Sequence, residues 1–183
     1  VINDPSVTGT SFNGFSTLLL NKVVDTNFFR ELVHNQKTLL RDQRLQIDWL
    51  ARGRYPIALW PRSVHVSEYQ KAGTPITEIA VKEGTYVSSN GGNIVLIKNA
   101  PHPNAARIFI NWVMSREGQS ILQNGLKQQS ARADISIREL DTIAVRNSAT
   151  KYLLSANESE KWILEEQDNY LKLAKELFEP LLK

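Results

Sequence analysis

Apolar residues recur at helical spacing along much of the chain. Phe12, Phe15 and Leu18 fall on one face of a helix that follows a turn-rich segment. Near the other end, an apolar series has spacings of seven, four, three and four, as on the buried face of an amphipathic helix; it comprises Ile163, Tyr170, Ala174, Leu177 and Leu181. Further helices are predicted over 27–35, over 42–52 before a stop at Gly53, over 103–115 as a long buried helix, and over 158–178.

Extended segments alternate with these helices. Residues 1–4 are predicted to end a strand, and Tyr55–Trp60 is predicted to be a buried strand that Pro61 closes. Two more extended segments are expected at 77–81 and 94–98, whereas the polar region 124–152 is expected to be irregular. Alternation of strands with crossover helices predicts the α/β class.

Composition narrows the function. The chain has 183 residues, of which 42% are hydrophobic and 22% are charged, as in folded globular proteins. No apolar run approaches the roughly 18 residues that a membrane span needs. The net charge of +3 comes from scattered basic residues, so no nucleic-acid partner is expected. With no Cys, and with His34, His65 and His102 lacking metal-ligand spacing, neither a metal site nor a cofactor is expected.

A hydroxyl-rich loop with a glycine precedes the first predicted helix. It comprises Thr8, Gly9, Thr10 and Ser11. Glycine permits close backbone approach, hydroxyls donate hydrogen bonds, and the N–H groups of a first helical turn carry about half a positive charge. The loop therefore suits a carboxylate, a phosphate or another oxyanion. The structural alternative is that Thr10 or Ser11 caps the helix.

A second candidate lies at the end of the predicted strand Tyr55–Trp60, where α/β folds place binding loops. Trp60 can stack on a ligand and Arg62 can pair with an acidic one; the alternative is a core tryptophan beside a solvated arginine. Asp42 and Arg44 can also reach a ligand from a helix start, although Asp42 is explained more simply by the helix dipole.

Catalytic patterns are weak. His102 enters a helix without a nearby carboxylate partner, which favours a surface or capping role. Glu165, Glu166 and Asp168 share a helix whose other side is apolar, which favours a solvated face. Neither a nucleophile elbow nor a phosphate-binding Gly-x-x-x-x-Gly-Lys loop is present, so no enzymatic activity is expected.

Several segments resemble one family in order and at plausible spacing. The chain is similar to the C-terminal part of family 1 extracellular solute-binding proteins, the iron(III)-like components of ATP-binding-cassette importers, which have a type 2 periplasmic-binding fold. The resemblance covers nearly the whole chain. Its segments are Asn3-Asp-Pro with Gly9-Thr, Trp49-Leu-Ala-Arg-Gly-Arg-Tyr-Pro-Ile, Ala100-Pro-His-Pro-Asn-Ala-Ala, Phe109-Ile-Asn-Trp, Ser115-Arg-Glu-Gly-Gln and Ser130-Ala-Arg-Ala-Asp.

In that family two α/β lobes close over a ligand, and the resemblance divides the chain accordingly. Residues 1–88 are expected to be most of the second lobe, and 89–150 to hold a crossing strand and a helical part of the first lobe. Residues 151–183 are expected to return as a helix that packs on the second lobe. The rest of the first lobe and the secretion signal would precede Val1, so the fragment alone is expected to bind ligand weakly.

The resemblance also assigns roles to residues. The turn Thr8–Ser11 would face the cleft, which favours ligand contact over capping. Asn90 would reach the cleft from an interlobe crossing, and Gly91 and Gly92 would form a hinge; the alternative is an ordinary polar turn. Ferric-ion binders of this superfamily place adjacent tyrosines in the second lobe, whereas all tyrosines here are isolated. Bare Fe(III) ligation is therefore disfavoured.

The function implied is capture of a small anionic or oxygen-rich ligand, followed by delivery to a permease in the membrane. Its location would be the periplasm or the extracellular face of the cytoplasmic membrane. The alternative is the effector-binding domain of a transcription regulator with the same two-lobed fold. An upstream secretion signal or an upstream DNA-binding segment would separate the two. A hydrolase or transferase on this scaffold has no support in the residues.

Overall fold

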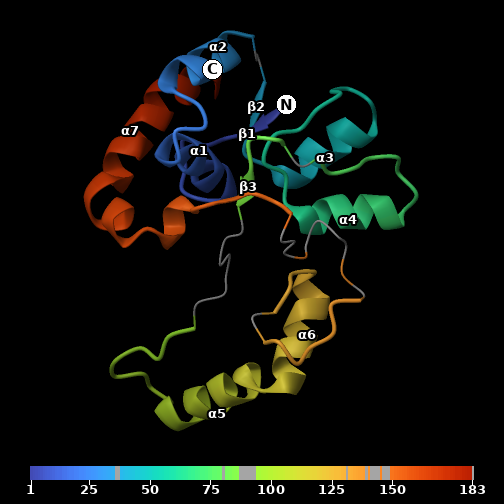
Figure 1. Cartoon of the computed structure of the whole chain (residues 1–183), viewed down its shortest axis with the longest axis vertical. Coiled ribbons are helices and arrows are strands. Elements are labelled where there is room, and N and C mark those ends of the chain that lie inside the picture. The colour runs from blue at the N-terminus through green and yellow to red at the C-terminus, as the bar shows by residue number, and fades with distance from the viewer. Residues whose placement is uncertain are drawn as a thin grey trace. The chain divides into compact units, whose positions relative to one another are not determined.

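Figure 1 shows the computed structural model of the chain, which describes residues 1–35, 38–79, 81–86, 94–130, 132–138, 140, 145 and 149–182. It is a mainly helical structure with a few short strands, compatible with the α/β class. The chain forms two compact units. Unit 1 comprises Val1–Ser88 and Lys151–Lys183, and unit 2 comprises Ser89–Thr150.

A small parallel sheet organises unit 1. Strand β1 (Ile2–Asn3) pairs with β2 (Leu39–Leu40) in parallel, with Ile2 opposite Leu39. Leu59 bridges to Ile2, also in parallel, and its N–H donates to Val1. On one side, the N–H groups of Ile2 and Asp4 donate to the chain around β2. On the other side, the carbonyl of Val1 accepts from the N–H of Leu59, so β1 lies between its two neighbours. The chain therefore moves from β1 to one side and returns to the other, which makes β1 a topological switch point.

Two helices lie between β1 and β2 in the sequence, and the next two follow β2. They are α1 (Thr10–Leu20), α2 (Thr26–Asn35), α3 (Gln43–Ala51) and α4 (Ser63–Lys71). The first three were predicted from the sequence, and they are confirmed. Asp42 caps α3 by accepting from the N–H groups of Arg44 and Leu45 at 2.8 and 3.0 Å. Helix α4 was not predicted, because only Val66 of its residues is buried and no apolar face marks it.

Aromatic side chains form the core of unit 1. The rings of Phe15 and Phe29 lie 4.6 Å apart, and Phe178 of α7 (Gln167–Phe178) meets Phe15 edge-on at 5.8 Å. Helix α7 packs against both α1 and α2, as Figure 1 shows. Burying each such ring contributes about 1.5 to 3 kcal/mol to folding. The predicted C-terminal helix is therefore part of unit 1, the unit that also contains the N-terminal strand β1.

The C-terminal part also joins unit 1 through a second parallel pair. Strand β3 (Thr85–Tyr86) pairs with β4 (Tyr152–Leu153). Burial raises the pKa of Tyr86 to about 12. The following turn η2 (Ala156–Glu158) bonds to α1, because the N–H of Ala156 donates to the Thr17 hydroxyl at 3.0 Å.

The C-terminal helix differs in register from the prediction. A π-helical turn, η3 (Trp162–Glu166), precedes α7 and adds a residue to the helical repeat. Trp162, 1% exposed, therefore enters the core, whereas Ile163 is 44% exposed. The expected place of Ile163 on the buried face is wrong for this reason. A short turn η4 (Glu179–Leu182) ends the described chain.

Three predicted strands are also wrong. Of Tyr55–Trp60, Leu59 bridges to Ile2, and Ile57 accepts a hydrogen bond from Val1. No named strand forms there, because Pro56 lacks an N–H and Trp60 has a positive φ of 56°. Within the described residues, neither 77–79 nor 94–98 belongs to a strand. Apolar runs alone do not make strands when no partner edge is available.

Unit 2 contains α5 (Pro103–Met114) and α6 (Arg116–Leu126). The start and end of α5 agree with the prediction, but its burial does not. Only Val113 is buried in α5, whereas Ile108 is 71% and Phe109 is 58% exposed. In the part of the chain that the structure describes, no helix combines the length and apolar character needed to cross a membrane.

Candidate functional site

The carboxyl ends of the parallel strands meet at one edge of the sheet in unit 1. Asn3 and Asp4 lie at the end of β1, Arg41 directly follows β2, and Trp60 follows the Leu59 bridge. Open α/β sheets bind ligands outside this edge, at the point where the strand order reverses. We therefore take this edge, with the start of α1, as the candidate site.

Helix α1 begins at this edge without a side-chain cap. Its N-cap is Gly9, whose φ of 156° and ψ of −163° lie in a region almost restricted to glycine. Thr10 and Ser11 belong to the helix itself, so the alternative that one of them caps it is wrong. Thr8 and Gly9 are exposed, and Thr10 is partly buried. The first-turn N–H groups therefore have no side-chain acceptor in the described structure.

Ser11 is buried and holds Asn3. Its hydroxyl donates to Asn3 Oδ1 at 2.6 Å, and Gln43 Nε2 donates to the same oxygen at 3.4 Å. Both hydrogen bonds go to the amide oxygen and neither uses the amide nitrogen. Asn3 is 5% exposed, and its Nδ2 has no hydrogen-bond partner among the described residues. A buried donor thus lies unused beside the first turn of α1.

Asp4 orders the loop between β1 and α1. Its side chain is fully buried; Oδ1 accepts from the Ser6 N–H at 2.7 Å, and Oδ2 accepts from Arg41 Nε at 2.8 Å. Ser6 is also fully buried, and its hydroxyl has no partner in the described chain. Both carboxylate oxygens are occupied, so the site presents donors and hydroxyls to a ligand.

Trp60 packs on α1. A Cβ built at Gly14 would lie 2.5 Å from the indole Nε1, and the ring centroid lies 6.3 Å from that of Phe29. This packing corresponds to the core alternative that the sequence left open for Trp60. Stacking of the same ring on a ligand stays a prediction.

The other predicted site residues either make no hydrogen bond to Asn3 within the described structure or lie outside the described residues. Arg62 is exposed at the start of α4. Arg44 pairs with Glu68 at 3.1 Å, and this hydrogen bond lowers the pKa of Glu68. The predicted ligand contact Asn90 and the predicted hinge Gly91–Gly92 lie outside the described residues.

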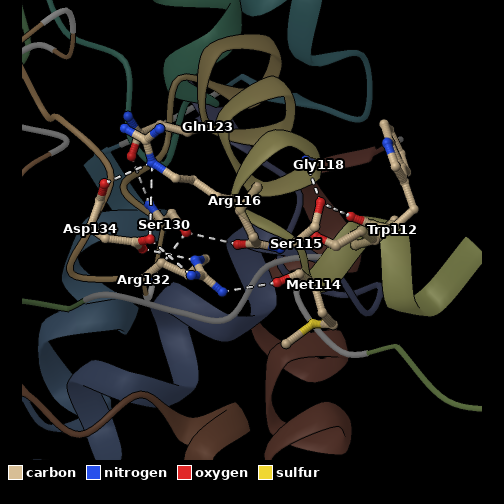
Figure 2. Close-up of polar contacts among 11 residues, drawn as sticks. Trp112, Met114, Ser115, Arg116, Gly118, Gln123, Ser130, Arg132 and Asp134 are labelled. Carbon is tan, nitrogen blue, oxygen red and sulfur yellow. Dashed lines mark hydrogen bonds and ion pairs between the residues drawn. The ribbon is translucent and has the colours of Figure 1, made fainter.

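Two of the segments that carry the family resemblance have structural roles in unit 2, as Figure 2 shows. Ser115 caps α6 by accepting from the Gly118 N–H at 3.1 Å, while its own hydroxyl donates to Trp112 O. Arg132 makes two hydrogen bonds to Asp134 and donates to the last residue of α5, Met114. The hydrogen bond from Arg132 lowers the pKa of Asp134. These contacts join the loop after α6 to the junction of the two helices.

The segment around Trp49 also has a structural explanation. Gly53, with a φ of 70°, follows the end of α3, and Arg54 lies over the Trp49 ring at 3.9 Å from its centroid. The ring of Tyr55 lies 5.7 Å from that of Trp49. This part of the resemblance concerns folding rather than ligand contact.

An open groove of about 890 Å³ lies at the opposite, C-terminal end of α1. Its lining is largely apolar and comes from α1, α2, the turn between them and α7; it includes Leu19, Val23, Val24, Phe28 and Leu173. Among the described residues, no group of three or more His, Asp or Glu side chains is placed to hold a metal ion. The polar features converge at the start of α1 instead.

Sequence reasoning identified the loop of this site but missed its buried polar residues. Asn3, Asp4 and Arg41 were not proposed as ligand contacts, although Asn3 and Asp4 were placed at the end of a strand. Two adjacent polar residues at the carboxyl end of a strand indicate a binding edge by the rule for α/β sheets. Arg41 could be added only after the pairing of β1 with β2 was known.

The chain was also compared with family models, with curated proteins and with solved structures. None of the three comparisons finds a match.

Proposed function

We propose that the chain is a binding module that holds a small anion at the carboxyl end of β1. One observation carries this proposal: the uncapped first turn of α1 lies beside Asn3, which is bonded to Ser11 through its amide oxygen and whose buried amide nitrogen has no partner among the described residues. Burying a donor without a partner costs about 1 to 3 kcal/mol, and an acceptor supplied by a ligand would recover that free energy. Binding rather than catalysis is the proposed activity.

The charge at the site favours an anion. The N-terminus of a helix carries the equivalent of about half a positive charge, and its free N–H groups bind oxyanions. The Gly9 N-cap leaves room for close approach, because nothing lies within 4 Å of a Cβ built there. Asp4, the nearby carboxylate, is neutralised by Arg41. A negatively charged ligand therefore meets donors without uncompensated repulsion.

The finer proposal is that this module belongs to the solute-binding component of an ATP-binding-cassette importer, with a type 2 periplasmic-binding fold. The division of the chain supports a two-lobed protein, since residues 1–88 and 151–183 form one unit and 89–150 another. The segment expected to return to the second lobe lies in the same unit as the N-terminal strand. A permease in the membrane would be the partner.

The surface of unit 2 also supports this proposal. Large apolar side chains are exposed on the segment before α5 and on α5 itself, among them Val95 at 77%, Ile97 at 72% and Ile108 at 71%. An exposed apolar surface of this kind marks a region that packs on further protein. Under the proposal, it packs on the remainder of the first lobe.

Titration with small anions tests the binding proposal. The ¹⁵N-labelled chain is titrated by NMR with inorganic phosphate, acetate and a neutral sugar at matched ionic strength. We expect saturable shifts of the amides of Thr10–Phe12 with an anion and none with the sugar. If none of the anions shifts these amides saturably, the proposed function is refuted. Because the method detects weak binding, the low affinity expected for a single lobe remains measurable.

A further inference from the structure

We propose that Asn3 and Arg41 form the selective part of this site and that together they bind an oxyanion with at least two terminal oxygens. Carboxylates and phosphates share this chemistry. The inference rests on the proposed function and assigns the ligand class to two residues that the loop Thr8–Ser11 does not include.

The parallel register brings these residues to the same edge. Asn3 lies opposite Leu40, so Asp4 and Arg41 occupy the next positions on neighbouring strands. Paired strands lie about 4.8 Å apart, which places the start of the Arg41 side chain beside that of Asp4. The two ligand contacts thus come from the ends of two strands rather than from one loop.

Asn3 supplies a fixed donor. Its oxygen accepts from Ser11 and Gln43, so the amide nitrogen is the end left for a ligand. The residue is 5% exposed, and Nδ2 lacks a partner in the described part of the chain. A donor held this way before binding loses little conformational entropy when it meets an acceptor.

Arg41 supplies an oriented charge. Its Nε donates to the buried Asp4 carboxylate at 2.8 Å, yet its side chain is 58% exposed. The anchoring bond uses Nε and leaves the two terminal nitrogens for a ligand. Their parallel N–H groups match two oxygens of one carboxylate or phosphate, a match that a lysine ammonium or a monatomic ion lacks.

The same contacts exclude other ligands. The Asp4 side chain is fully buried and both of its oxygens accept hydrogen bonds from the protein, so the carboxylate is not exposed to a cation or a ligand hydroxyl. The Asn3 amide and the Arg41 guanidinium then present only donors, so the ligand must supply acceptors. A fully ionised oxyanion satisfies this requirement best.

The test uses the complete 183-residue chain and measures Kd by NMR for inorganic phosphate, acetate and chloride. Arg41→Gln removes the charge, and Arg41→Lys retains it without the planar pair of nitrogens. Asn3→Asp keeps the acceptor for Ser11 but replaces the donor with a negative oxygen. The matched control is Arg52→Gln, since Arg52 is also exposed and also donates through Nε to a carboxylate, that of Asp48, at the far end of α3.

We expect Arg41→Gln and Asn3→Asp to raise Kd for phosphate or acetate at least tenfold, Arg41→Lys to raise it severalfold, and Arg52→Gln to leave it within twofold. Chloride is expected to bind at least tenfold more weakly than the preferred oxyanion. A preference for phosphate or for acetate identifies the ligand group.

Equal affinities in the wild type and in the Arg41 variants would overturn this inference while leaving anion binding at α1 intact. Equal binding of chloride would overturn the two-oxygen requirement. Absence of saturable binding of any anion by the wild type would refute the proposed function itself. If Asn3→Asp fails to fold, as a collapsed NMR spectrum would show, the Arg41→Lys comparison decides, because that variant keeps the charge that pairs with Asp4.

Discussion

The packing of Trp60 on Gly14 can be tested by adding a single methyl group. In Gly14→Ala the new Cβ would lie 2.5 Å from Nε1 and 2.6 Å from Cδ1 of the indole. Carbon atoms in contact lie about 3.5 to 4.0 Å apart, so the ring must move by about 1 Å. It packs near Phe29 and starts from a backbone with a φ of 56°, which limits that movement.

Two opposing terms set the expected free energy. Alanine is favoured over glycine inside a helix by about 1 kcal/mol, whereas overpacking costs about 1 to 3 kcal/mol. Gly14→Ala is therefore expected to destabilise unit 1 by up to about 2 kcal/mol. In a Trp60→Leu background the steric term disappears and the same change is expected to stabilise. The coupling between the two sites should be about 1 to 3 kcal/mol.

Gly125 in α6 provides the control, because nothing lies within 4 Å of a Cβ built there. Gly125→Ala should stabilise its helix by about 0.5 to 1 kcal/mol. Native-state hydrogen exchange of amides in α1 and α6 measures the two units separately. If Gly14→Ala stabilised α1 in the wild type as Gly125→Ala stabilises α6, the close packing of Trp60 on this helix would be refuted.

Three further predictions concern pH, backbone contact and the site. The raised pKa of Tyr86, about 12, leaves stability unchanged below pH 10 and lowers the free energy of unfolding by up to about 2 to 3 kcal/mol as the pH rises from 10 to 12. Urea unfolding against pH should show this loss, and Tyr86→Phe should remove it; an identical loss in the variant contradicts the assignment. Gly118→Ala, whose Cβ would collide with the backbone at the end of α5, should destabilise α6 by about 2 kcal/mol or more in hydrogen exchange, opposite in sign to Gly125→Ala. Ser11→Ala removes the 2.6 Å bond to Asn3 and should lower the free energy of unfolding by about 1 to 2 kcal/mol and weaken phosphate binding, whereas unchanged melting and unchanged Kd would mean that this bond orients nothing.

The helices of unit 1 were largely predictable because local chemistry determines them. α1 has its apolar residues at helical spacing, and α3 is bounded by the Asp42 cap and by Gly53. Helix α4 lacks such a pattern, since it buries little. The π-helical turn before α7 was also invisible, because one added residue exchanges Ile163 for Trp162 on the buried face without changing the composition.

The strands were less predictable because each named strand is two residues long and depends on a distant partner. In the sequence, both α1 and α2 separate β1 from its partner β2, and unit 2 separates β3 from its partner β4. In contrast, the stronger apolar run 94–98 pairs with no described strand. Hydrophobicity indicates that a segment seeks burial, whereas pairing requires an available edge.

The candidate site shows the same division between local and distant information. The loop Thr8–Ser11 was identifiable from residue types alone, but the role of Ser11 was not, because its hydroxyl contacts Asn3 rather than the helix N-terminus. Arg41 is oriented by its ion pair with Asp4, and the helices α1 and α2 separate these two residues in the sequence. Only the parallel register of β1 and β2 brings that pair together.

The location of the unpartnered polar atoms distinguishes a binding site from an imperfect core. Within the described residues, Trp162 Nε1 lies unpartnered in the aromatic core, where a polar ligand would have to displace packed rings. Asn3 Nδ2 lies instead at the end of the switch-point strand, and Ser6 Oγ lies on the segment that joins this strand to the uncapped start of α1. Folding leaves both groups without the water they bonded to, at a cost of about 1 to 3 kcal/mol each, and an acceptor at this edge would return that free energy while meeting the helix dipole. Because such a ligand binds the folded state alone, its binding energy adds to the stability of unit 1. The polar atoms that folding leaves without partners at this edge are therefore the ones that a bound ligand would satisfy.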